Sequence, residues 1–213
     1  MHDLTESEIS RRLADAQLFP AEEDSSAQWL PASPRPAAVL IPILRVADEW
    51  HLLFTRRTET VADHKGQVAF PGGSADPGDP SPEFTALREA EEEIGLNPAD
   101  VSVLGRLCQL PTISNYCITP IVAVIPWPYP LHLAAIEVCR TFFIPLTWLA
   151  DPAHHKTRTR FLPGTSQSLP VIYFQPYDGE LLWGVSAQIT VNLLTALRLL
   201  RRSYSTKNRP LRI

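Results

Sequence analysis

The sequence predicts an α+β or α/β sandwich that holds a mixed β-sheet. Apolar runs of β-like composition recur along the chain, whereas only two or three segments show helical periodicity. The chain also contains 21 prolines in 213 residues. So many prolines indicate numerous loops and short elements rather than a helical bundle. This length suits one largish domain with added termini, which is enough to bury a core.

Composition and charge narrow the classes of partner. The hydrophobic content of 45% and the charged content of 20% are typical of a folded, soluble protein. A net charge of −4 gives no general attraction to nucleic acid or to an anionic membrane. No apolar run approaches the roughly 20 residues that span a bilayer. We therefore expect neither a nucleic-acid partner nor a membrane partner.

The cysteines and the N-terminal segment indicate the cellular compartment in which the protein is expected. Cys108, Cys117 and Cys139 show no metal-binding spacing, and we expect them to be buried thiols in a reducing environment. The charged, amphipathic segment "MHDLTESEISRRLADAQLF" does not resemble a secretory signal. These features predict a cytoplasmic protein.

The N-terminal region predicts a helix followed by an arm. The residues from Thr5 to Glu8 have the form of a capping box, so a short helix is expected from there to about Leu18. The Pro- and Ser-rich stretch "PAEEDSSAQWLPASPRP" then reads as a linker. We therefore divide the chain into an N-terminal helix and arm (1–35), a main domain (36–201) and a basic tail (202–213).

The main domain mixes strands with two helices. The loop "SADPGDPSP" leads into a helix from about Glu83 to Ile94, and helical periodicity predicts another helix from Ala187 to about Arg201. The remaining β-like runs predict strands. They lie at 37–44, 50–56, 66–70, 101–107, 118–126, 138–146, 157–163 and 169–177.

The first of these helices carries an unusual group of carboxylates. Glu89, Glu92 and Glu93 share one face and lie in the last turns before Gly95, at the negative end of the helix dipole. Each exposed charge misplaced in this way costs about 0.3–1 kcal/mol. An ordinary solvated helix face is one interpretation. A bound dication would relieve the repulsion, and converging carboxylate oxygens are the ligands that Mg²⁺ prefers.

The same segment resembles the Nudix box, G-x5-E-x7-R-E-U-x-E-E-x-G-U with U aliphatic. In "GGSADPGDPSPEFTALREAEEEIGL", Gly73 matches the first glycine and the run from Arg88 to Leu96 matches the second half in order. The first half departs from the pattern, because Asp79 stands where the glutamate belongs and one extra residue precedes Arg88.

The segment before the box resembles the coenzyme A diphosphatase subfamily, whose pattern is close to L-L-T-x-R-[SA]-x3-R-x3-G-x3-F-P-G-G. The chain reads "LFTRRTETVADHKGQVAFPGG", with Phe54, Thr58 and Ala62 as the departures. The resemblance covers roughly Pro36 to Leu200. The matching residues are Leu53, Thr55, Arg57, Gly66, Phe70, Pro71, Gly72 and Gly73.

The resemblance implies a Nudix-like αβα sandwich with a central mixed β-sheet. It also implies a hydrolase that uses Mg²⁺ or Mn²⁺ and splits coenzyme A into 3′,5′-ADP and 4′-phosphopantetheine, with a homodimer left open. Two alternatives remain: a Nudix hydrolase of another nucleoside diphosphate derivative (ADP-ribose or NADH), and a non-catalytic Nudix-fold binding module. The retained glutamates favour an enzyme.

The resemblance also assigns the metal site and the catalytic groups. Glu89 and Glu93 are expected as the main metal ligands, with Glu92 sharing the metal and Gly73 offering its carbonyl oxygen. Catalytic roles are expected for Glu92, Glu137 and Arg88. Among them Arg88 holds part of the glutamate charge, and Glu137 is the candidate base from outside the box.

Cations before the box are the expected substrate ligands. Arg56 and Arg57 end a strand, so alternation should point one of them into the site. Arg57 matches the subfamily pattern, and its guanidinium fork suits a diphosphate. The 3′-phosphate of coenzyme A also needs cationic partners. The group expected to bind the substrate is Arg56, Arg57, His64 and Lys65.

Overall fold

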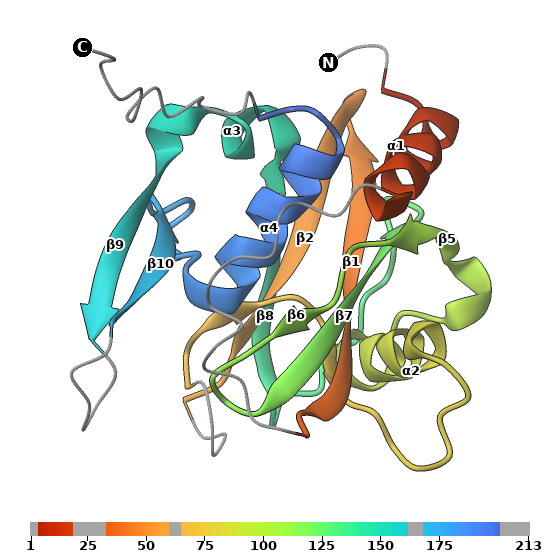
Figure 1. Cartoon of the computed structure of the whole chain (residues 1–213). Helices are drawn as coiled ribbons and strands as arrows, with labels where there is room; N and C mark the ends of the chain where they lie inside the picture. Colours follow the sequence, from red (N-terminus) through yellow and green to blue (C-terminus); the bar gives the residue numbers. More distant parts are fainter. Residues whose placement is uncertain (1–3, 19–32, 60–64, 162–167, 201–213) are drawn as a thin grey trace, which may run out of the picture.

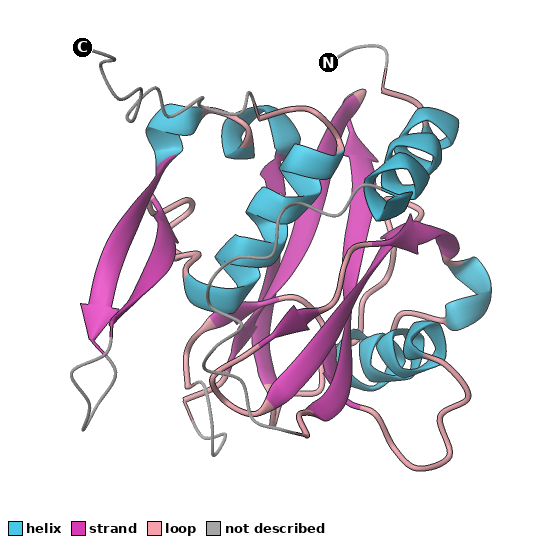
Figure 2. Ribbon diagram, in the orientation of Figure 1, coloured by secondary structure: helices cyan, strands magenta, loops and turns pink. Residues whose placement is uncertain are grey.

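The computed structural model describes residues 4–18, 33–59, 65–161 and 168–200. Within these residues a mixed sheet lies between helices, with the central strand order β3-β2-β1-β7-β5 (Figures 1 and 2). The predicted sandwich is confirmed. The predicted tail (202–213) and most of the predicted arm lie outside the described residues.

The structure contains these elements. The strands are β1 (Arg35–Val46), β2 (Glu49–Arg57), β3 (Val68–Ala69), β4 (Gly72–Ser74), β5 (Ser102–Arg106), β6 (Leu110–Pro111), β7 (Tyr116–Val124), β8 (Val138–Pro145), β9 (His155–Phe161) and β10 (Ser168–Phe174). The helices are α1 (Glu6–Leu18), α2 (Pro82–Ile94), α3 (Leu146–Leu149) and α4 (Gly184–Ala196), with 3₁₀ turns at Pro98–Asp100 and Pro152–His154.

Strand β1 is the centre of the sheet. It runs parallel to β7 and antiparallel to both β2 and β4. The turn from β1 to β2 has two residues, Ala47 and Asp48, with φ values of 47° and 63°. Two consecutive positive φ values are the geometry that matches the twist of a two-residue hairpin. The turn therefore fixes the register of β2, whose end carries Arg57 into the site.

The two faces of β1 bury different side chains. Ile41 and Ile43 belong to the core cluster that includes residues of α1 and α4, whereas Leu40 and Leu44 belong to the cluster that includes α2. All four are fully buried, and each such burial stabilises the fold by about 1.5–3 kcal/mol. Helices thus cover both faces of the sheet, as Figure 2 shows.

Helix α1 packs onto the main core. Its buried residues Ile9 and Leu13 join the cluster that contains α4, and the hydroxyl of Ser10 donates to the carbonyl of Leu104 on β5 at 2.8 Å. Arg12 donates to the carbonyl of Leu197, just after α4. The predicted helix is confirmed, whereas the division of the chain at residue 36 stays a prediction.

Several predicted elements differ from the structure. Only Val68 and Ala69 of the predicted strand 66–70 pair as β3. The last helix begins at Gly184 and ends at Ala196, earlier than predicted. Strands β4 and β6 and helix α3 were not predicted. Two glycines of β4 carry no apolar side chain, and β6 and α3 are too short to show a period.

The predicted strands at 157–163 and 169–177 form a separate hairpin. Strands β9 and β10 form a two-stranded sheet that stands beside the main sheet (Figure 1). The reason lies in β9, whose Lys156, Arg158 and Arg160 alternate along an exposed strand. Charged side chains at this spacing do not enter a core without partners.

The cysteines are not the buried thiols that the sequence predicted. All three are free, and Cys108 and Cys139 are exposed while Cys117 is partly buried. Cys139 lies on β8, which among the described strands pairs only with β2. No helix among the described residues is long and apolar enough to cross a membrane.

Candidate active site

Two caps fix the ends of α2, the helix that carries the glutamates. The side chain of Ser81 accepts a hydrogen bond from the backbone N–H of Phe84 at 3.2 Å, and Pro82 follows at the first helical position. At the other end Gly95 adopts a φ of 68°, and its N–H reaches the carbonyls of the last turn. This left-handed cap suits glycine, and it ends the helix where the sequence predicted.

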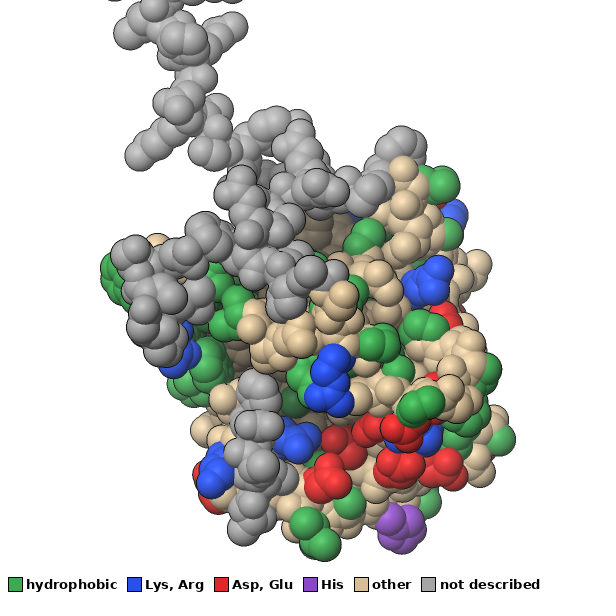
Figure 3. All heavy atoms as spheres, turned by 60° about the horizontal axis from the view of Figure 1, so that its bottom comes forward, with side chains coloured by type: hydrophobic (Ala, Val, Ile, Leu, Met, Phe, Trp, Pro, Cys, Tyr) green, Lys and Arg blue, Asp and Glu red, His purple; other side chains and the backbone are tan. Residues whose placement is uncertain are grey.

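Burial of one face of α2 orients the other. Ala86, Ala90 and Ile94 are fully buried against the sheet, and the small alanines let the helix lie close to β1. Glu93 is buried next to this face and Glu89 lies at its edge, so the two carboxylates come close to Arg57 at the end of β2 and to Gly73 of β4. Figure 3 shows acidic and basic side chains gathered on this face of the molecule.

Glu93 is the most buried carboxylate of the site. Its side chain is only 5% exposed, and Nη1 of Arg57 lies 3.4 Å from its Oε1. Burial raises the pKa of Glu93 to about 7; Arg57 opposes this rise, and the charges of Glu89 and Glu137 add to it. A buried carboxylate beside other carboxylates is costly to ionise. A cation at this position would remove that cost.

Glu89 is held against the backbone of β4. A Cβ built on Gly73 would meet Oε2 of Glu89 at 2.5 Å, so only glycine leaves room for this carboxylate. Burial raises the pKa of Glu89, and the nearby charges of Glu92 and Glu137 raise it further. Arg88 opposes the shift through an ion pair of 2.8 Å with Glu89. Gly73 and Glu89 are therefore neighbours, as the box implies.

Arg88 connects the loop of the box to the helix. Its Nη2 lies 3.1 Å from Oδ2 of Asp79 and 3.2 Å from the carbonyl of Ser74, while its Nη1 pairs with Glu89 and Glu92. Hydrogen bonds, chiefly from Arg88, lower the pKa of Asp79 to about 2. The shorter Asp79 thus reaches Arg88 despite the extra residue in the loop.

The two remaining predicted catalytic carboxylates lie towards solvent. The side chain of Glu92 is 60% exposed and lies 3.2 Å from Arg88. Glu137 is exposed at the rim of the cleft that also contains Glu89 and Glu93. Because its charge raises the pKa of both of these glutamates, its carboxylate acts on the same site. The structure therefore brings Glu137 to the box, although the two are distant in sequence.

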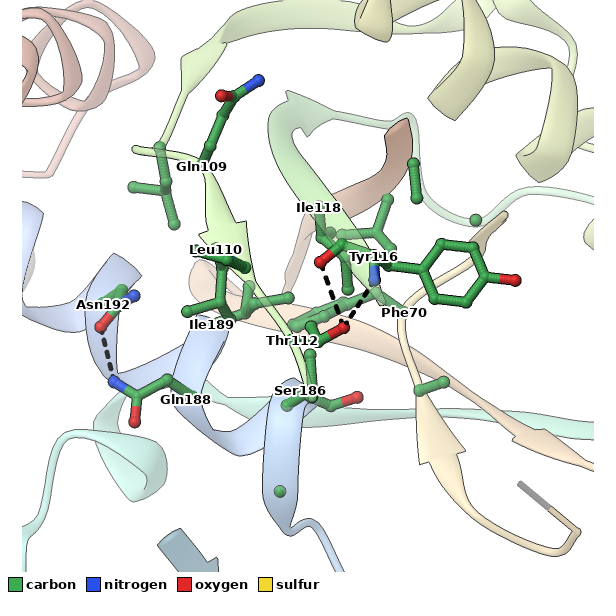
Figure 4. Close-up of a pocket in the computed structure, with 18 of the residues that line it drawn as sticks. Phe70, Gln109, Leu110, Thr112, Tyr116, Ile118, Ser186, Gln188, Ile189 and Asn192 are labelled. Atoms are coloured by element: carbon green, nitrogen blue, oxygen red, sulfur yellow. Dashed lines mark hydrogen bonds between the residues drawn. The ribbon is translucent and has the colours of Figure 1, made fainter. Parts of the chain in front are cut away.

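A long cleft extends from the glutamates. Its walls come from β6 and β7 on one side and α4 on the other, and Figure 4 shows Ile118 and Ile189 between them. Sequence reasoning missed most of these residues, because only the tertiary fold brings them together. Polar residues of the cleft that were not predicted include Gln109, Thr112, Ser186, Gln188 and Asn192.

Two predicted substrate ligands do not lie in this cleft. Arg56 turns away from it and pairs with Glu59 at 3.2 Å and with the nearly buried Glu180 at 3.6 Å. Lys65 is exposed in the turn before β3 and is not among the cleft residues. Alternation along β2 sends Arg57, and not Arg56, into the cleft. His64, the other predicted ligand, lies outside the described residues.

The carboxylates are paired with arginines. Among the described residues, no three His, Cys, Asp or Glu side chains are arranged to hold a metal ion. The donor set nevertheless fits a hard dication, since Glu89 and Glu93 offer carboxylate oxygens beside β4, Glu89 next to Gly73 and Glu93 with a hydrogen bond from the backbone of Gly72. Burial, together with the neighbouring carboxylates, raises the pKa of Glu89 and of Glu93 despite their arginine partners, so both groups are costly to ionise without a further cation. The assignment of these ligands stays a prediction.

The pKa of Glu93 predicts how pH affects stability without metal. Between its ordinary value of 4.5 and about 7 the folded state holds a proton that the unfolded state has lost. Folding stability in EDTA should therefore fall by about 1–3 kcal/mol as pH rises from 4.5 to 7. Urea unfolding at pH 5 and pH 8 measures this loss. Glu93→Gln should lose less stability over this window than Glu91→Gln, and equal losses would contradict the shift.

Comparisons with known proteins agree with this geometry. Residues 34–127 match the NUDIX domain family. The Nudix hydrolase NudL of Yersinia pestis (strain Pestoides F) is 40% identical over 165 residues, which cover 78% of this chain and 81% of NudL. NudL of Yersinia pseudotuberculosis serotype O:1b (strain IP 31758) gives the same values.

A solved structure supports the fold. The MutT/nudix family protein from Enterococcus faecalis superposes with a TM-score of 0.52 and 15% identity, over 86% of this chain and 72% of that protein. Sequence identity to NudL, rather than this structural likeness, establishes the relationship. The chain therefore belongs to the Nudix hydrolases, enzymes that act on the pyrophosphate bonds of nucleoside diphosphate derivatives.

Proposed function

We propose that this Nudix hydrolase is a coenzyme A diphosphatase that depends on Mg²⁺ or Mn²⁺. It would split coenzyme A into 3′,5′-ADP and 4′-phosphopantetheine. The strongest support is the position of Arg57, which matches the subfamily pattern and lies in the cleft 3.4 Å from Glu93. A guanidinium at this place can contact a diphosphate next to the carboxylates of the box.

The residues before the box support the same substrate. Phe70, Gly72 and Gly73, three of the residues that match the coenzyme A pattern, line the cleft beside Glu89. The pattern thus describes the wall against which the diphosphate would lie. Beyond this wall, the apolar stretch around Ile118 and Ile189 suits a long acyclic group such as pantetheine (Figure 4).

Each acidic residue has a proposed role. Glu89 and Glu93 would hold the cation, with Glu92 as a third donor and Gly73 offering its carbonyl oxygen. When bound there, a dication would supply charge to neutralise the phosphate oxygens and would lower the pKa of water. Arg88 keeps Glu89 and Glu92 in place through its two ion pairs.

Proton transfer is assigned to the rim of the cleft. Glu137 is exposed there and is close enough to affect the pKa of Glu93, so its carboxylate can accept a proton from the attacking water. Arg57, which also lines the cleft, would contact the diphosphate. Its guanidinium group would stabilise the negative charge that develops on the phosphate oxygens in the transition state.

Steady-state kinetics tests the substrate. We expect kcat/KM for coenzyme A to exceed the values for ADP-ribose and NADH under one Mg²⁺ condition, and again with Mn²⁺. Arg57→Ala should lower kcat/KM for coenzyme A by about 10–100-fold, which corresponds to a lost charge-assisted contact. A preference for ADP-ribose or NADH would reject coenzyme A as the substrate and leave the Nudix family assignment intact.

A further inference from the structure

The hairpin of β9 and β10 carries an arginine, Arg160, that lines the cleft. The cations expected to bind the 3′-phosphate included Arg56 and Lys65, and neither lies in the cleft. The cleft is nevertheless lined by five arginines of the described residues. They differ in whether a carboxylate lies at ion-pair distance. The five are Arg12, Arg57, Arg88, Arg160 and Arg198.

Four of these arginines are paired with carboxylates. Arg57 and Arg88 pair with glutamates of α2, Arg12 pairs with Glu8 of α1, and Arg198 lies 3.6 Å from Asp15. Each of these four guanidinium groups therefore already has a carboxylate beside it. Among the described residues, Arg160 is the cleft-lining arginine without a carboxylate at ion-pair distance.

Aromatic rings hold Arg160 in place. Its guanidinium carbon lies 5.0 Å from the ring centroid of Trp183, a distance at which a cation interacts with the ring face. Trp183 in turn stacks on Tyr173, with centroids 5.5 Å apart and an interplanar angle of 8°. Arg158 lies over Tyr173 in the same way, at 5.3 Å. The rings orient the guanidinium groups without neutralising them.

The surrounding charge favours an anion. Lys156, Arg158 and Arg160 alternate along β9, so all three project from one face of the hairpin. The sequence has no acidic residue between Asp151 and Asp178. In a chain with a net charge of −4, this hairpin is a local concentration of positive charge beside the reaction cleft.

We propose that Arg160 binds a phosphomonoester on the nucleoside half of the substrate. This inference rests on the proposed function, for which that group is the 3′-phosphate of coenzyme A. Arg160 binds the phosphate through its guanidinium fork, while Arg158 and Lys156 add favourable charge. The hairpin is thus a specificity arm that distinguishes a nucleoside bearing an extra phosphate from one without it.

Direct binding of the product half tests the arm without relying on turnover. The ligands are 3′,5′-ADP and 5′-AMP, which differ only in the 3′-phosphate, titrated calorimetrically into the full chain. The wild type should bind 3′,5′-ADP about tenfold more tightly than 5′-AMP, and Arg160→Ala should remove this preference. Thr159→Ala, on the opposite face of the same strand, should keep it.

The outcomes are distinguishable. Equal binding of the two nucleotides by the wild type, or a preference that survives in Arg160→Ala, would overturn the assignment of Arg160. Equal loss of both nucleotides in Arg160→Ala would also overturn it, because a general structural effect would explain the loss. Failure of coenzyme A cleavage with the binding preference intact would reject only the proposed substrate. For cleavage, Arg160→Ala should lower kcat/KM for coenzyme A more than for dephospho-coenzyme A.

Discussion

Replacing Glu93 by glutamine is expected to lower kcat by about 100-fold or more. Glu93 is 5% exposed and has Arg57 as its cationic partner. Glutamine keeps the shape of the side chain and removes the charge that would hold a dication. The fold should survive, because the change also removes a charge that is costly to bury. Turnover at saturating Mg²⁺, together with the circular dichroism spectrum, measures both effects.

The matched control for this change is Glu91→Gln. Glu91 belongs to the same helix and is exposed, with no ion pair among the described residues. It should keep nearly normal turnover. If Glu93→Gln keeps normal turnover as well, Glu93 is not a ligand of the catalytic metal.

Replacing Gly73 by alanine should also lower kcat strongly, by about 10–100-fold. The added Cβ would lie 2.5 Å from Oε2 and 2.6 Å from Cδ of Glu89, so the carboxylate must move. The substitution would thus displace the carboxylate of Glu89, the proposed metal ligand, without replacing that residue. Gly73 does not have a left-handed φ, so alanine at this position adds no backbone strain that could itself lower kcat.

Gly78→Ala provides the control for Gly73→Ala. A Cβ at Gly78 meets nothing within 4 Å, and Gly78 also lies in the loop of the box. This variant should have wild-type turnover and thermal stability. Unchanged turnover in Gly73→Ala would show that Glu89 can move without loss, and would argue against its role as a ligand.

The sequence predicted well those features that depend on local pattern. The limits of α2 follow from Ser81, Pro82 and Gly95, whose capping preferences are local properties of the chain. Strand alternation predicted that one of Arg56 and Arg57, at the end of β2, points into the site. Alternation alone did not say which of the two it is. The structure excludes Arg56 because Glu180, far away in sequence, pairs with it.

Features that depend on tertiary packing could not be predicted. Arg160 lines the cleft because the hairpin stands beside α4, and nothing in its own strand indicates that position. The role of Asp79 was equally hidden. Its side chain is one methylene shorter than glutamate, yet the loop brings it to 3.1 Å from Arg88. Loop geometry of this kind is not readable from spacing.

The most direct test of the proposed chemistry is mass spectrometry of the products from an equimolar mixture of coenzyme A, ADP-ribose and NADH. One sample contains Mg²⁺ and a matched sample contains EDTA. The proposed function predicts that 3′,5′-ADP and 4′-phosphopantetheine accumulate first, and only with Mg²⁺. Earlier accumulation of AMP, or the same products at the same rate in EDTA, would contradict it.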